Sequence, residues 1–146
     1  MVIKVFSLYK TGAPKEALRE GEERFIENGG PLYPELVDVL DNCQVRTVTA
    51  RTNDFLAIHR VELGEVRTYV KLALTAGKYV NSQWCMGNAP RGIFACDAYI
   101  VPAQLYIPSL REVSTVLMYV KVCILETGNT VAVISLHDSI NTKDLS

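Results

Sequence analysis

Two histidines and two of the cysteines are the residues of this chain whose types could carry acid–base or nucleophilic chemistry. His59 falls within a segment rich in strand-forming residues, and His137 falls at the end of another. A catalytic role would pair one of them with Cys85 or Cys96, because a thiol needs a nearby base to become a good nucleophile at neutral pH. No spacing in the sequence supports such a pair. Structural histidines and core cysteines are therefore the main expectation, and a small enzyme with a Cys/His pocket is the alternative.

Metal and cofactor sites lack a signature in the sequence. The cysteines contain no Cys-x-x-Cys pair and are far apart, at positions 43, 85, 96 and 123. Structural zinc sites draw their ligands from short-range pairs, and phosphate loops need glycines between a strand and a helix. We therefore expect no metal and no cofactor, and we expect the thiols to be reduced and mostly buried.

The charges of the chain are unevenly distributed although its net charge is only −1. Residues 44–125 carry nine Lys/Arg against five Asp/Glu, whereas both flanking segments are acidic. This basic middle favours an anionic surface as partner. The residues expected to contact that surface are Lys71, Lys78, Trp84 and Arg91, most of them in an expected loop at 78–91. In a second interpretation Trp84 fills the end of the core, and in a third it stacks on bases in a small nucleic-acid-binding module.

The most specific short string is Leu32-Tyr33-Pro34-Glu35-Leu36. It fits the Leu-Tyr-Pro-x-Leu late-domain pattern, by which viral structural proteins recruit an ESCRT-associated adaptor for budding. Tyr33, Leu32 and Leu36 would be anchors for a groove, while Pro34 limits the entropy lost on binding. A helix that starts at Pro34 and turns Leu36 toward the core would give the same letters. Burial of Tyr33 and Leu36 would therefore exclude the adaptor.

The elements around these residues predict an α+β fold in one domain, residues 1–146. A first strand is expected at 3–8, and a helix runs from Thr11 or Gly12 to the Asn28-Gly29-Gly30 stop signal. A second helix begins at Pro34 and ends near Leu40. The remainder is rich in β-branched and aromatic residues, which predicts a mostly antiparallel sheet, as a sandwich or partly open barrel. Its strands are placed near residues 44–50, 55–63, 66–75, 92–101, 113–125 and 130–136.

The composition is that of an ordinary globular protein, with 49% apolar and 21% charged residues. The sequence has no basic leader followed by a long apolar run, and no apolar stretch long enough to span a bilayer. We therefore expect a cytoplasmic location, with peripheral membrane or virion association as the finer hypothesis.

Three short pieces of the sequence, in this order, resemble matrix proteins of negative-strand RNA viruses, in particular those of the rhabdovirus type. They are Ile3-Lys4-Val5 leading to Gly12-Ala13-Pro14, then Gly29-Gly30-Pro31-Leu32, then Trp84-Cys85 followed by Asn88, Pro90 and Arg91. The resemblance implies a non-enzymatic structural protein that self-associates under a membrane and contacts a nucleocapsid. The chain departs from that family because it lacks a long basic N-terminal arm and has a slightly negative net charge. Self-assembly through strand edges and apolar patches would then have to contribute more.

Overall fold

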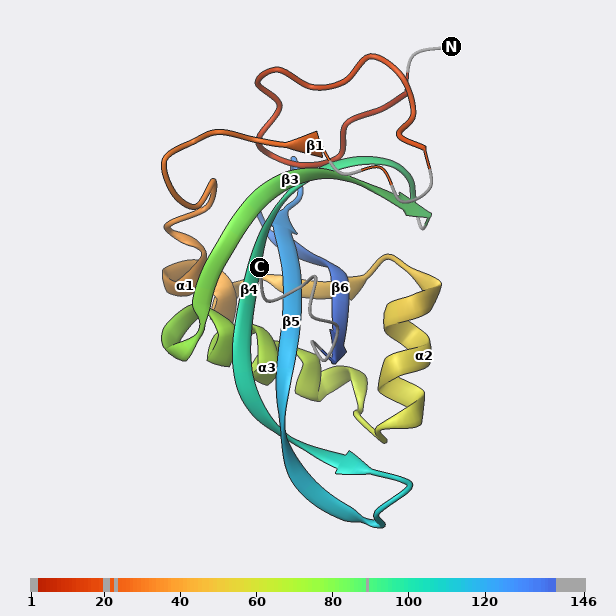
Figure 1. The fold of residues 1–146 in the computed structure, drawn as a ribbon. Helices are drawn as coiled ribbons and strands as arrows, with labels where there is room; N and C mark the ends of the chain where they lie inside the picture. The colour runs from red at the N-terminus through yellow and green to blue at the C-terminus, as the bar shows by residue number, and fades with distance from the viewer. Residues whose placement is uncertain (1–2, 20–21, 23, 89, 139–146) are drawn as a thin grey trace.

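The computed structural model of the chain describes residues 3–19, 22, 24–88 and 90–138 (Figure 1). Its strands form one mixed six-stranded sheet in the order β1-β3-β4-β5-β6-β2. The fold is therefore α+β, as expected, but it contains a single sheet and not a sandwich. The elements are β1 (Arg24–Phe25), α1 (Leu36–Val39), a 3-10 turn (Leu40–Asn42), β2 (Gln44–Thr47), α2 (Ala50–Ile58), α3 (Leu63–Ala76), β3 (Lys78–Asn88), β4 (Arg91–Ile107), β5 (Glu112–Ile124) and β6 (Thr130–Asp138).

Strands β3 to β6 form an antiparallel meander at the centre of the sheet. The strands expected near 92–101, 113–125 and 130–136 are confirmed, and Gly128, with a φ of 81°, lies in the turn between the last two. The expected strand at 44–50 forms its first four residues as β2. The sheet is mixed because β2 runs parallel to β6, whereas its other four pairings are antiparallel, in line with the mostly antiparallel sheet that was expected.

Two segments predicted as strands, 55–63 and 66–75, are largely helical. The Thr49 side chain caps the start of α2, and Glu62 and Glu65 form a capping box at the start of α3. These caps satisfy amides that would otherwise lack partners at a helix start. The apolar residues of α3 also recur with helical spacing, because the positions that are buried on it are Val66, Val70 and Ala73.

The helix expected to start at Thr11 or Gly12 is wrong, because the described residues of 11–27 contain no helix. Leu18 is buried, whereas Phe25 is 57% exposed. The apolar residues therefore do not form one stripe that a helix could bury, and the segment instead pairs with β3 through the short strand β1. The expected strand at 3–8 makes isolated bridges across the ends of β4 and β5, from Val5 to Ile93 and from Ser7 to Leu125.

Of the two remaining predictions, the second helix is confirmed and the loop at 78–91 is wrong. The expected second helix forms as α1, beginning after Pro34; α1 buries Leu36, and the 3-10 turn that follows it buries Leu40. The expected loop at 78–91 is wrong, because residues 78–88 form β3. Its polar and apolar residues do not alternate, and it ends in Gly87 and Asn88, which are typical of loops, so no strand pattern is visible in the sequence.

The helices cover the sheet unevenly. In Figure 1, α1 and α3 lie behind the sheet, and α2 lies beside β6. The backbone amide of Asn88 donates to the carbonyl oxygen of Val48 (3.1 Å), which brings the end of β3 to the end of β2 and leaves the sheet curled. None of the described helices combines the length and apolar character needed to span a membrane.

Candidate anion-binding site

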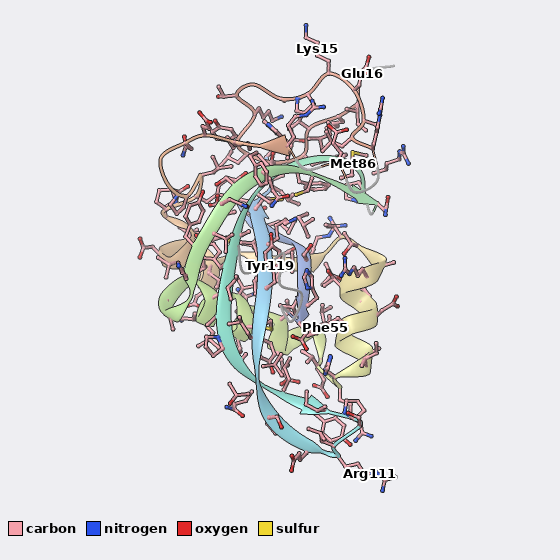
Figure 2. The ribbon with its side chains drawn as sticks, in the orientation of Figure 1. Lys15, Glu16, Phe55, Met86, Arg111 and Tyr119 are labelled. Carbon is pink, nitrogen blue, oxygen red and sulfur yellow. The ribbon has the colours of Figure 1, made fainter. Side chains whose placement is uncertain are left out.

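A pocket of about 690 Å³ lies where β3 bends toward β6 and the start of α2. The segment around Leu18 closes one side, and β5 contributes to the wall between β3 and β6. Met86 lies on the bent part of β3, and Tyr119 lies farther down on β5 (Figure 2). The pocket is thus assembled from five parts of the chain that are distant in sequence.

The charged residues that line the pocket are mostly cations. Four are Lys or Arg, and Glu22 is the carboxylate among the described lining residues. Glu22 is itself neutralised, because its side chain pairs with the guanidinium of Arg24. A hydrogen bond from the Arg19 amide (3.1 Å) and then the Arg24 guanidinium hold the pKa of Glu22 below its usual value. Although the net charge of the chain is −1, positive charge is therefore concentrated at this pocket. The four cations are Arg19, Arg51, Arg91 and Lys121.

Arg51 is positioned by the contact between α2 and β6. The Thr49 hydroxyl lies 3.0 Å from the carbonyl oxygen of Ile134, and the Thr52 hydroxyl lies 3.3 Å from the same oxygen. The Thr49 hydroxyl also accepts a hydrogen bond from the Thr52 amide. These bonds fix the first turn of α2 against the sheet. Arg51, in that turn, remains exposed at the pocket.

Lys121 lies on β5 within the sheet, opposite Ala98 on β4 and Ser135 on β6. Its side chain is partly buried, and its ammonium lies 5.5 Å from the centre of the Tyr119 ring. Among the described residues, no carboxylate lies within ion-pair distance of this ammonium. An anion in the pocket would stabilise such a partly buried cation.

Neither Cys85, which lines the pocket, nor the nearby Cys96 suits nucleophilic chemistry. A hydrogen bond with Cys96 and burial together raise the pKa of Cys85 well above its ordinary value, and burial first of all raises the pKa of Cys96. Both thiols therefore stay protonated at neutral pH, whereas a nucleophilic cysteine needs a lowered pKa. His137 does line the same pocket as Cys85, but the Cys85 thiol lies 3.8 Å from the carbonyl oxygen of Gln83.

The second histidine, His59, does not line this pocket. The His59 ring packs against Phe55 with 4.4 Å between ring centres and a tilt of 47° between ring planes, and its Nδ1 lies 2.9 Å from the carbonyl oxygen of Tyr106. These contacts are compatible with the structural role that was the main expectation for this histidine. Within the described residues, no group of three or more His, Cys, Asp or Glu side chains could hold a metal ion.

The peptide expected to bind a budding adaptor is inside the protein. Tyr33 and Leu36 are 2% and 1% exposed, and the Tyr33 hydroxyl donates to the carbonyl oxygen of Ala95 (2.6 Å). The amides of Leu32 and Tyr33 donate to the buried carboxylate of Asp97. Only Pro34 of the expected contact residues is exposed. The condition that would exclude adaptor binding is therefore met in this fold.

The residues expected to contact an anionic surface are not together. Arg91 and Trp84 line the pocket, but Trp84 is 4% exposed and packs near Tyr9, so the interpretation that it fills the core is the correct one. Lys71 is on α3, where its ammonium pairs with Asp41 at 3.0 Å. Lys78 is exposed at the start of β3. The sequence analysis missed Arg19, Arg51 and Lys121, and of these only Lys121 gave a signal, as a lysine within an apolar strand.

No family model, no curated protein and no solved structure matches the chain.

Proposed function

We propose that this chain is a non-enzymatic structural protein that docks on an anionic surface by taking a phosphate-bearing headgroup into its basic pocket. The observation that carries the proposal is the cluster of four cations around a pocket whose carboxylate is already paired. Cations around a low-dielectric hollow focus the electrostatic potential and raise the local concentration of anions. The protonated thiols support a binding role over a nucleophilic one.

A membrane headgroup is favoured over a nucleic acid by the aromatic side chains. Trp84 and Tyr119 are 4% and 7% exposed, so neither presents a ring on which a base could stack. Phe25, in contrast, is 57% exposed. It is paired with Gln83 across β1 and β3, and Gln83 lines the pocket. Cross-strand partners project from the same face of a sheet, so an apolar ring borders the cationic pocket. This combination suits a bilayer interface, where rings insert beside charged headgroups.

The proposal agrees with what the resemblance to viral matrix proteins implies about membrane contact. Peripheral attachment at the cytoplasmic side of a membrane, and a structural role in virion assembly that includes contact with a nucleocapsid, remain parts of this proposal. Recruitment of a budding adaptor through Leu32–Leu36 is not part of it, because Tyr33 and Leu36 are buried.

Vesicle flotation tests the proposed function. We expect the protein to float with phosphatidylserine vesicles at low salt and to be released as the salt concentration rises, because exposed charges are screened beyond a Debye length of roughly 8 Å at physiological ionic strength. Phosphatidylcholine vesicles should not bind it.

Two further experiments distinguish a membrane headgroup from free phosphate as the anion that the pocket binds. Inorganic phosphate at equal ionic strength should compete with the vesicles. Phe25→Ala should weaken vesicle binding by about 1 kcal/mol, since roughly half of a phenylalanine side chain is available for burial, and should leave phosphate binding unchanged. Equal binding to neutral and acidic vesicles, or no binding to either, would refute the proposal.

A further inference from the structure

The strands β4 and β5 continue beyond the rest of the sheet as a two-stranded ribbon. Pairing of β3 with β4 ends at Ile100, and pairing of β6 with β5 is described as far as Met118. Among the described residues, 101–107 and 112–117 therefore pair only with each other. The ribbon is the lower projection in Figure 1, and Arg111 marks its tip in Figure 2. Such a ribbon has two edges that could accept another strand.

The edge formed by β4 is blocked. Pro102 has no amide hydrogen to offer, the Tyr69 hydroxyl of α3 donates to the carbonyl oxygen of Gln104 (3.1 Å), and Nδ1 of His59 lies 2.9 Å from the carbonyl oxygen of Tyr106. These contacts also fix the direction of the backbone. At alternate residues of β4, namely 102, 104 and 106, the backbone polar groups point away from β5.

Among the described residues, the edge formed by β5 at 113–117 has no partner strand. In an antiparallel pair, residues opposite each other point their backbone groups in the same sense, inward or outward. Leu117, Thr115 and Val113 are opposite Pro102, Gln104 and Tyr106, so their amides and carbonyls point outward. Within the described chain no strand pairs with these three residues, and no side chain bonds to their backbone.

The residues of this β5 edge favour pairing with another strand. Its sequence, Val113-Ser114-Thr115-Val116-Leu117, contains no charge, proline or glycine, although exposed edges are usually protected by lysine or proline. Val113 and the neighbouring Leu110 are 60% and 58% exposed. Residues 101–117 carry one Arg and one Glu, so electrostatic repulsion does not oppose the approach of an identical ribbon.

We infer that the β5 edge pairs with the same edge of a second copy of this chain, in an antiparallel two-fold dimer. Centred on Thr115, the pairing places Val113 opposite Leu117 of the other copy, so the outward backbone groups of both strands are satisfied at once. A two-fold contact is self-complementary and closes after two copies. This inference does not depend on the anion pocket, which lies at the opposite end of the sheet from the tip of the ribbon.

Light scattering across a protein concentration series tests the dimer. The short edge predicts a weak contact, so the mass should rise from 16.2 kDa toward twice that value at concentrations on the order of tens to hundreds of micromolar. Thr115→Pro removes an outward amide that β4 does not use, and it should keep the protein monomeric at every concentration. Val113→Lys should do the same, whereas Ser109→Lys, in the turn, adds the same charge and should leave the dimer intact.

A second measurement keeps the test independent of how well the proline variant folds. Amide exchange at Val113 and Thr115 should slow by at least about tenfold at the concentration where the mass doubles, and should not slow in Val113→Lys. The pocket variant Arg51→Ala/Arg91→Ala should still dimerise, which separates this inference from the proposed function. A wild-type protein that stays monomeric, or a dimer that survives both edge variants, would overturn the inference.

Discussion

Replacing Arg51 and Arg91 together by alanine is expected to weaken binding to phosphatidylserine vesicles about 30-fold. Each cation near an anionic surface contributes about 1 kcal/mol, so two removed cations lower the binding free energy by about 2 kcal/mol. Both side chains are exposed at the pocket, so the thermal midpoint of unfolding should barely change. Vesicle titration at low and at physiological salt measures the effect.

The matched control for that variant is Lys71→Ala/Lys78→Ala. It removes the same net charge, and it takes away the two cations that were expected from the sequence but lie outside the pocket. The Lys71 pair with Asp41 is exposed, so its loss costs little stability. The control should bind vesicles nearly as well as the wild type. Equal losses in both variants would show that bulk charge, and not the pocket, drives attachment.

The second large effect is expected at Asp97, the buried carboxylate that holds the segment before α1. It is 1% exposed, and it accepts hydrogen bonds from the amides of Leu32 (2.9 Å) and Tyr33 (3.0 Å) and from the Ser82 hydroxyl (2.6 Å). Asp97→Asn turns an amide group toward at least one of these donors and leaves it unpaired. We expect a loss of about 2–4 kcal/mol in the free energy of unfolding, measured by urea titration.

The same residue predicts a pH dependence. Burial raises the pKa of Asp97 above its ordinary value. The folded protein therefore binds more protons than the unfolded chain between the two pKa values, and this contribution to stability falls as the pH rises through the raised pKa. The stability difference between wild type and Asp97→Asn should accordingly be largest near pH 4 and smaller at neutral pH. Asp54→Asn, at an exposed position on α2, should change stability by less than about 0.5 kcal/mol. A neutral effect of Asp97→Asn would contradict the anchoring role.

The central strands could be predicted from the sequence because their apolar residues are continuous. β6 and residues 118–124 of β5 are largely buried on both faces, and such strands appear as long β-branched and apolar runs. α3 was missed for a related reason. Its Val66 and Val70 favour a strand by composition, but they are four residues apart and follow a capping box, so helical burial prevails over β propensity.

Most of the candidate site could not be predicted from the sequence, because the order of the strands in the sheet brings its residues together. Arg51 reaches the pocket only because β2 runs parallel to β6, and Lys121 reaches it because β5 lies between β4 and β6. Periodicity along the chain carries no information about that order. The string Leu32–Leu36 shows the opposite problem. Its letters fit a partner-binding peptide, but Tyr33 and Leu36 are also good core residues, and Asp97 supplies the hydrogen bonds that bury them.

The most direct test of the anion pocket is an NMR titration of the labelled protein with a soluble short-chain phosphatidylserine. We predict saturable chemical-shift changes at the amides of Arg51, Cys85, Arg91 and Lys121, which come from four separate elements and all line the pocket. Shift changes confined to Lys71 and Lys78, or none at millimolar ligand, would contradict the account.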